Sequence, residues 1–207
     1  MTPIILLDYL GIALFAATGA LAASRRELDL IGFMFLASVT GIGGGTVRDL
    51  VLDVPVFWVE HPIHILVCAG TAALVYITAH LVEYRYRLLL WLDAIALAAY
   101  SVFGAYKGLM VTGSPVLAIV MGMLTGTMGG IMRDVLANEP SVLLRKEIYV
   151  TAAMAGAVAF VLARMMELPV GIPALLGFVS ALGIRSSALV FGWTLPTYRS
   201  RPGRHIP

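Results

Sequence analysis

Apolar residues dominate seven long stretches of the chain, and short charged segments separate them. A helix that crosses a membrane needs about 20 mostly apolar residues, which is the length that these stretches offer. The pattern predicts an all-α membrane protein with seven transmembrane helices at approximately 3–23, 29–57, 62–82, 88–108, 115–142, 147–167 and 170–193. The connections are too short for a soluble domain, so we expect residues 1–207 to form one transmembrane domain.

A run of three glycines at 43–45 interrupts the second stretch and is followed by Arg48 and Asp49. A weaker copy, T-G-T-M-G-G-I-M-R-D, lies in the fifth stretch at 125–134. A glycine in a helix interior costs about 1 kcal/mol relative to alanine, so each run favours an opening of the helix. Opened backbone at membrane depth must be buried in protein or line a water-filled cavity. We therefore predict that both helices are broken at their glycines.

The two glycine segments belong to an internal repeat whose copies are offset without a gap (93 − 8 = 85; 140 − 55 = 85). The matched pairs are Asp8 with Asp93, Gly19 with Gly104, Thr40 with Thr125, Gly41 with Gly126, Gly44 with Gly129, Gly45 with Gly130, Arg48 with Arg133, Asp49 with Asp134 and Pro55 with Pro140. Each copy holds three predicted helices, so the second enters the membrane from the opposite side. This predicts two inverted repeats, 3–82 and 88–167, with the seventh helix (170–193) and a basic tail (196–207) outside them.

Composition supports a membrane protein, since 60% of residues are hydrophobic, 13% are charged and the mean hydropathy is +0.93. The dispersed basic residues give no case for a nucleic-acid partner. The single cysteine, Cys68, excludes a disulfide framework and a thiolate metal site. The glycine run lacks the preceding strand that a dinucleotide-binding loop needs. We therefore predict no enzyme activity, no cofactor and no resident metal.

Loop arginines predict the orientation, because cytoplasmic loops are enriched in lysine and arginine. With the N-terminus outside, the cytoplasmic side receives most of the cationic loop residues, which are Arg25, Arg26, Arg85, Arg87, Arg145, Lys146 and those of the tail. The outer side then receives little beyond Lys107 and Arg164. We expect the N-terminus outside and the C-terminus in the cytoplasm.

Polar side chains follow each glycine run at helical spacing. Thr46, Asp49 and Asp53 fall at i, i+3 and i+7, and Asp134 and Asn138 repeat the arrangement in the second copy. A charge at the membrane centre costs about 3 kcal/mol, so this face predicts a protein-lined aqueous pathway. Tight helix packing is the alternative reading, because small residues also recur at intervals of four. Packing alone does not explain why Arg-Asp follows the glycines in both copies.

The roles of the remaining charged residues stay open on the sequence alone. Arg48 and Arg133 fit pathway groups and structural partners of a neighbouring carboxylate equally well. Asp8 and Asp93 lie near the predicted membrane edges, where anchoring or ion pairing is as consistent as ion binding. Lys107 ends the fourth span and can snorkel to the interface, although a gating role fits the same position.

The paired T-G-x-x-G-G-x-x-R-D segments, the three-plus-three-plus-one spans and the short length resemble the bacterial relatives of the trimeric intracellular cation (TRIC) channels, which also carry a glycine-transporter label. The resemblance implies a homotrimer in a bacterial inner membrane, surrounded by lipid, with a potassium- and sodium-conducting pore in each protomer between two kinked helices. It implies pore hinges at Gly43, Gly44, Gly45, Gly126, Gly129 and Gly130, with Arg48, Asp49, Arg133 and Asp134 beside the pathway. Met128 replaces the glycine found at 43, which implies a stiffer second hinge.

Three functions remain consistent with these observations. The first is a passive cation channel, which the resemblance and the two polar stripes favour. The second is a secondary transporter of a small zwitterion such as glycine, because inverted repeats with opened helices suit transport equally well. The third is a membrane scaffold without a transport activity.

Overall fold

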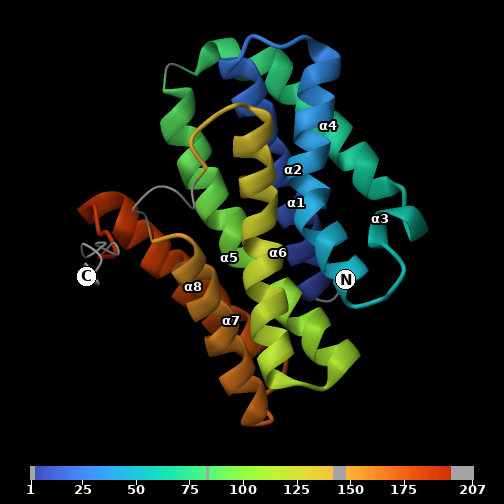
Figure 1. The fold of residues 1–207 in the computed structure, drawn as a ribbon, viewed down its shortest axis with the longest axis vertical. Helices are drawn as coiled ribbons and strands as arrows, with labels where there is room; N and C mark the ends of the chain where they lie inside the picture. Colours follow the sequence, from blue (N-terminus) through green and yellow to red (C-terminus); the bar gives the residue numbers. More distant parts are fainter. Residues whose placement is uncertain (1–2, 83, 142–147, 197–207) are drawn as a thin grey trace, which may run out of the picture.

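The computed structural model describes residues 3–82, 84–141 and 148–196, and these residues form a helical bundle (Figure 1). Its elements are α1 (Pro3–Arg25), α2 (Leu30–Val51), α3 (Phe57–Glu60), α4 (Ile63–Thr78), the 3-10 helix η1 (Ala79–Leu81), α5 (Arg85–Thr112), α6 (Pro115–Leu136), α7 (Val150–Met165) and α8 (Gly171–Phe191). Each predicted stretch overlaps one helix, with η1 extending α4, although α7 has only 16 residues. Within the described part of the chain, five are long and apolar enough to cross a membrane, namely α2, α4 with η1, α5, α6 and α8.

Two predicted spans are too long, because α2 ends at Val51 rather than 57 and α6 ends at Leu136 rather than near 142. The residues that follow, Asp53 and Asn138, adopt positive φ angles of 52° and 51°. The next backbone N–H in each case donates to a carbonyl oxygen five residues back. This is the turn in which a left-handed residue ends a helix, and prolines commonly follow it, as Pro55 and Pro140 do here. The basic tail from 197 onward lies outside the described residues.

The predicted breaks at the glycines are wrong, because α2 and α6 run as continuous α-helices through both runs. A continuous helix satisfies its own backbone hydrogen bonds, which matters more in lipid than the propensity cost of glycine. The glycines instead remove side chains where helices meet. Equivalent positions do so in each copy: Gly19 packs on the backbone of Leu36, and Gly104 packs on that of Met121.

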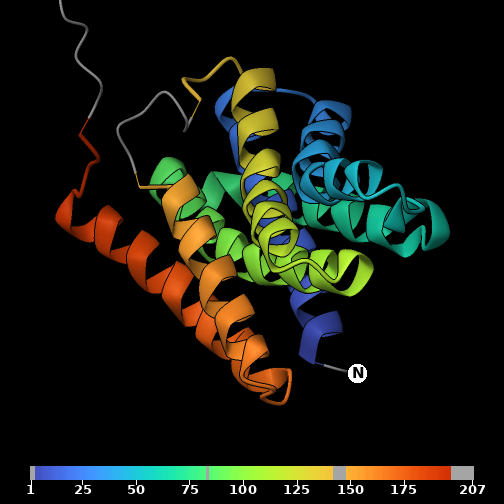
Figure 2. The ribbon, with the colours of Figure 1, turned by 60° about the horizontal axis from the view of Figure 1, so that its bottom comes forward.

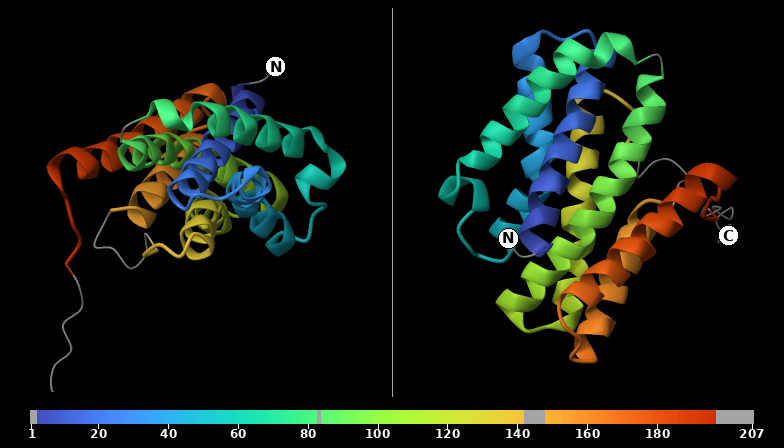
Figure 3. Two further views of the ribbon diagram at one scale, coloured as in Figure 1. Left: turned by 90° about the horizontal axis from the view of Figure 1, so that it is seen from above. Right: turned by 180° about the vertical axis from the view of Figure 1, so that it is seen from behind.

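The helices of the first copy lie on one side of the bundle, and the α7–α8 pair lies on the other (Figures 1 and 2). In the centre of the bundle, α1 packs against α2, α4 and α5. In the same region, α6 packs against α2, α5 and α7. The view from behind shows α1 beside α5, and α8 packs against α5 as well (Figure 3). Residues of both copies therefore meet along the α1–α2–α5–α6 centre.

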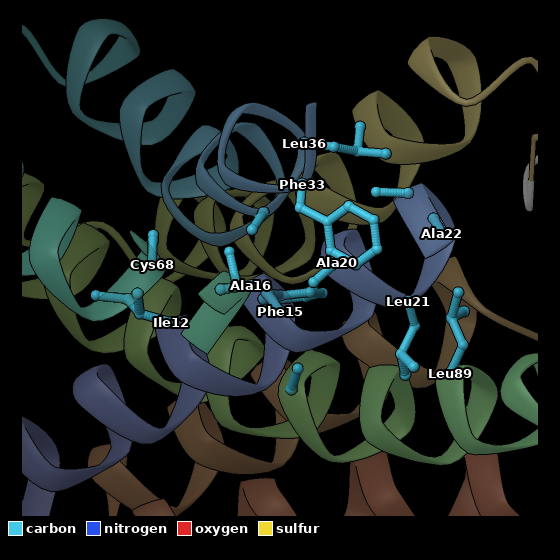
Figure 4. Close-up of a cluster of buried hydrophobic side chains, with 14 of the residues drawn as sticks. Ile12, Phe15, Ala16, Ala20, Leu21, Ala22, Phe33, Leu36, Cys68 and Leu89 are labelled. Atoms are coloured by element: carbon cyan, nitrogen blue, oxygen red, sulfur yellow. The ribbon is translucent and has the colours of Figure 1, made fainter. Parts of the chain in front are cut away.

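Small, aromatic and branched aliphatic side chains form a buried core around α1 and α2 (Figure 4). Phe15, Ala16, Ala20 and Phe33 are each at most 4% exposed. The alanines allow the helix axes to approach closely, as is common in membrane proteins where small residues line helix contacts. The outer faces carry many exposed leucines, isoleucines and valines, as expected of helices that face lipid.

Candidate functional site: two buried charge clusters

The glycine segments of α2 and α6 cross antiparallel and in close contact. A Cβ on Gly44 would collide with the carbonyl oxygen of Thr125, and a Cβ on Gly129 would collide with that of Thr40. The two contacts are equivalent, because both pairs of positions share the offset of the repeat (125 − 40 = 85; 129 − 44 = 85). Each threonine hydroxyl donates to the carbonyl oxygen four residues earlier in its own helix, at 2.6 Å. At Gly44 and Gly129 the crossing is thus a direct contact between glycine and a backbone carbonyl, and the two Arg-Asp pairs lie on opposite sides of it.

One group of charged residues, which we call the Asp49 cluster, comprises Asp8, Arg48, Asp49 and Lys107. Asp49 is fully buried and its Oδ1 receives both Arg48 Nε and Lys107 Nζ at 2.8 Å. Its Oδ2 accepts the backbone N–H of Phe57 at 3.0 Å. A carboxylate shared by two cations and an amide is well compensated for burial. The predicted pathway group Asp49 is therefore an ion-pair centre.

Arg48 is 1% exposed and lies between aromatic rings. Its guanidinium carbon is 5.1 Å from the centre of the Phe103 ring and 5.7 Å from that of Phe57. Its NH1 has no hydrogen-bond partner within the described residues. Arginine stacks favourably on aromatic faces, but a ring does not replace a hydrogen-bond acceptor. Arg48 is therefore held less completely than Asp49.

Asp8 completes the Asp49 cluster from α1. Its Oδ1 accepts a long hydrogen bond from the Tyr100 hydroxyl at 3.4 Å, and its Oδ2 lies 3.4 Å from His64 Nε2. The other ring nitrogen of His64 lies 2.8 Å from the carbonyl oxygen of His61. Two long contacts fix a carboxylate less firmly than the short ones at Asp49. Asp8 is consequently a loosely bonded carboxyl group within electrostatic reach of Arg48.

The second group, which we call the Arg133 cluster, comprises Thr18, Asp93, Arg133 and Asp134. Arg133 NH1 donates to Asp93 Oδ1 at 2.6 Å and to Thr18 Oγ1 at 2.9 Å. Its Nε and NH2 both donate to Asp134 Oδ1, at 3.0 and 2.9 Å. The side chains of Arg133 and Asp93 are only 3% and 2% exposed. This arginine bonds through all three nitrogens and joins α1, α5 and α6.

Other predicted site residues are placed differently from the expectation. Thr46 faces a short helix, since it donates to the carbonyl oxygen of Ile42 and accepts from Trp58 Nε1 at 2.9 Å. Asp53 and Asn138 do not lie on the helix face with Asp49 and Asp134, because both helices end before them. Both are exposed. The predicted stripe is therefore shorter than the spacing suggested.

Several residues of the site were missed by the sequence reading. Thr18 and Phe103 occupy equivalent positions in the two copies (103 − 18 = 85), and each contacts the arginine of the opposite copy. Extending the alignment beyond identical residues would have found this pair. Lys107 aligns with Ala22 (107 − 22 = 85), which carries no charge. The repeat therefore did not indicate that Lys107 pairs with Asp49. Among the described residues, no group of three His, Cys, Asp or Glu side chains is placed to hold a metal ion.

Comparisons with known proteins follow the same division of the chain. Residues 5–80 and 90–165 each match the model of a family described as glycine transporter. The TRIC trimeric intracellular cation channel orthologue from Rhodobacter sphaeroides has a similar structure, with a TM-score of 0.91 and 49% identity over 93% of this chain and 100% of that chain. This chain belongs to the bacterial TRIC family.

Curated TRIC-family relatives carry membrane-protein names. The UPF0126 membrane protein of Vibrio cholerae is 42% identical over 93% of this chain and 82% of that protein. The UPF0126 inner membrane protein YadS of Escherichia coli is 39% identical over 93% of this chain and 94% of that protein. A solved structure described under conductance through TRIC cation channels is 26% identical, with a TM-score of 0.86. TRIC proteins are not enzymes, so that prediction is confirmed, and the chain is a membrane protein.

Proposed function

We propose that the protein is a monovalent cation channel for potassium and sodium, with a pathway inside each protomer along α2 and α6. The observation that carries this proposal is the pair of buried charge clusters on either side of the glycine crossing. Ionised side chains within a membrane bundle face the protein interior or a water-filled cavity and commonly mark ion pathways. The solved relatives that resemble this chain are described as cation channels, which supports the same conclusion.

The geometry suggests how the pathway is closed and opened. Lys107 Nζ forms an ion pair with Asp49 Oδ1, so a cation that approaches this carboxylate competes with the lysine for it. The α2–α6 crossing admits no added methyl group, so conduction requires these two unbroken helices to separate. Glycine-to-carbonyl contacts hold helices by packing and weak Cα–H···O contacts, which are easier to break than ion pairs. The glycines 43–45, 126, 129 and 130 then act as the sliding surface rather than as hinges.

Topology and assembly complete the proposal. The two copies of the repeat are related by an axis in the membrane plane, with the N-terminus outside, so that the Asp49 cluster lies near the outer surface and the Arg133 cluster near the inner one. This orientation follows from the distribution of loop arginines. Three copies assemble as a homotrimer in lipid, as the descriptions of the relatives suggest. Broad apolar faces on the outside of the bundle suit contact with lipid or with neighbouring copies.

A secondary transporter of glycine is the alternative, because the matching family model carries that description. A zwitterion needs one anionic and one cationic partner, and each cluster offers both kinds of side chain within one buried site. The two functions differ in flux: a channel passes many ions during each opening, whereas a transporter moves its substrate once per conformational cycle.

Planar-bilayer recording of the purified protein in mixed potassium, sodium and glycine solutions distinguishes these functions. The channel predicts unitary potassium and sodium currents that glycine does not change. Saturable uptake of radiolabelled glycine into proteoliposomes without unitary currents would replace the channel by the transporter. A scaffold predicts neither flux, and replacing Asp49 or Asp134 by alanine would then leave its activity unchanged while preserving assembly.

A further inference from the structure

A buried histidine meets a buried carboxyl group where the start of α4 packs against α1. The side chains of His64 and Asp8 are 5% and 12% exposed, and His64 Nε2 lies 3.4 Å from Asp8 Oδ2. Two aromatic rings restrain the imidazole, since it stacks on Tyr9 at 5.1 Å and contacts Phe57 in a T-shaped arrangement at 4.9 Å between ring centres. The packing therefore holds His64 Nε2 toward the Asp8 carboxyl group.

The hydrogen-bond partners of His64 indicate where its hydrogens lie. Its Nδ1 is 2.8 Å from the carbonyl oxygen of His61, and a carbonyl oxygen only accepts, so Nδ1 carries a hydrogen. In the neutral ring, Nε2 then has only a lone pair, and this lone pair faces Asp8 Oδ2. With Asp8 ionised, two acceptor atoms face each other without a hydrogen between them. One added proton, on Nε2 or on Oδ2, turns this contact into a hydrogen bond.

The surroundings of the pair place one permanent charge beside it. Arg48 of α2 lies within electrostatic reach of Asp8, and α3 contacts His64 through the Phe57 ring, which does not titrate. Residues 1–7 carry no ionisable side chain. The ionisable neighbours without a permanent charge are Tyr9 of α1, His61 before α4, Cys68 of α4 and Tyr100 of α5. A proton bound between Asp8 and His64 therefore adds its charge next to Arg48.

We propose that Asp8 and His64 form a proton-binding site that regulates the Asp49 end of the proposed pathway. The proton comes from water at the start of α4, where His61 and Ile63 are exposed. Binding raises the charge of the Asp49 cluster by one, because Asp8 is then neutral or paired with an imidazolium instead of compensating Arg48. The added positive charge repels potassium and sodium, so acid should reduce conduction. The regulation rests on the proposed function, whereas proton binding is measurable without any current.

The first test follows the histidine rings by 15N NMR of the full chain in detergent between about pH 5 and 8, the range in which histidines ordinarily change charge. The signals that vanish in His64→Gln are those of His64. We expect them to change with pH, and we expect Asp8→Asn to move that change to lower pH, because the ring loses a negatively charged neighbour. The exposed His80 is the internal control and should behave alike in both proteins. His64 signals that do not change with pH, or that change alike in the wild type and Asp8→Asn, overturn the proposal.

The second test compares the unitary potassium conductance at about pH 8 and about pH 5. We expect a severalfold fall on acidification of the wild type. Asp8→Asn keeps the side-chain shape without the charge, so its conductance should stay near the acid value at both pH values. His61→Gln is the matched control, because it keeps the carbonyl that bonds His64 and removes the neighbouring ring, and it should respond as the wild type does.

Three outcomes overturn the regulation: no response in the wild type, an equal response in Asp8→Asn, or a response that His61→Gln abolishes. If the wild type carries no current at either pH, the proposed function fails, and the NMR titration still decides whether Asp8 and His64 share a proton.

Discussion

The Asp49 cluster and the Arg133 cluster occupy equivalent positions in the two copies of the repeat, but their central arginines are bonded very differently. Arg133 donates to two carboxylates and a hydroxyl. Arg48 donates to one carboxylate through Nε and meets a phenylalanine ring where Arg133 meets Thr18. At equivalent positions of the two copies, Arg133 therefore donates hydrogen bonds through all three of its nitrogens, whereas Arg48 donates through Nε and leaves NH1 without an acceptor among the described residues.

This difference in bonding indicates that the Arg133 cluster holds helices together, whereas ion pairs of the Asp49 cluster can be exchanged. Every described contact of Arg133 is buried, so separating them leaves charges unpaired in a medium that cannot solvate them. Lys107, in contrast, is 25% exposed and shares Asp49 with Arg48, so it can leave while the carboxylate keeps a partner. We infer that opening of the proposed pathway begins at the Asp49 cluster and that the Arg133 cluster holds α1, α5 and α6 together.

Removing the two arginines should affect stability most and unequally. Arg133→Met leaves Asp93 and Asp134 without their guanidinium, which should cost about 3–5 kcal/mol. Arg48→Met should cost clearly less, because Asp49 keeps Lys107 and a backbone N–H. Thermal unfolding in detergent, followed by loss of the size-exclusion peak, measures both. Equal losses would contradict the comparison, and Arg87→Met, at an exposed position, serves as the control.

The crossing between the clusters should respond equally from both copies. Gly44→Ala and Gly129→Ala each place a methyl group against a backbone carbonyl, which should cost about 1–3 kcal/mol in the same assay. Gly70→Ala and Gly183→Ala are matched controls, because nothing lies within 4 Å of an added Cβ there. The controls should be neutral or stabilising by up to about 1 kcal/mol. A large effect at only one of the two crossing glycines would refute the equivalence of the copies.

The hydroxyl that distinguishes the clusters should have a smaller effect. Thr18→Val removes the acceptor of Arg133 NH1 while keeping the side-chain shape, and should cost about 1–2 kcal/mol. Thr78→Val is the control, because the Thr78 hydroxyl only donates to a carbonyl oxygen of its own helix on the exposed surface. If both valines cost the same, the bond from Arg133 to Thr18 contributes nothing specific.

The smallest stability effect is expected at Lys107. Lys107→Met removes a partly exposed ammonium from the buried Asp49 carboxylate and should cost about 1 kcal/mol, because Arg48 and the Phe57 N–H still compensate Asp49. The same substitution should raise the unitary potassium conductance, because the Asp49 carboxylate becomes available to passing cations. Lys107→Arg should restore the wild-type conductance. A fall in conductance on Lys107→Met would show that Lys107 does not block access of cations to Asp49.

Much of the fold follows from the sequence, because an apolar stretch of membrane length has few alternatives to a helix. Helix ends and glycines were harder to predict. Asp53 and Asn138 carried a usable signal, since a proline follows each by two residues. The continuity of α2 and α6 did not follow from glycine propensity, because that propensity is measured in water, whereas the backbone of a membrane helix has no other partner.

Charge pairing was the least predictable part of the site. The internal repeat in the sequence identified Arg48, Asp49, Arg133 and Asp134 as matched pairs. It could not show that Lys107 reaches Asp49, because the partner lies on another helix and the aligned residue in the first copy is Ala22. It also could not show which arginine is saturated, since Thr18 and Phe103 both read as ordinary residues of an apolar helix.

If cations pass the Asp49 carboxylate in the proposed channel, the current must depend on its charge, which unitary recording of Asp49→Asn measures. We expect a severalfold fall in potassium conductance, because Arg48 and Lys107 would then line the proposed pathway without a compensating charge. Asp53→Asn makes the same chemical change at an exposed residue four positions later, and the asparagine suits its left-handed backbone as Asn138 does in the other copy. Asp49→Glu should recover most of the current. Wild-type conductance in Asp49→Asn would contradict the claim.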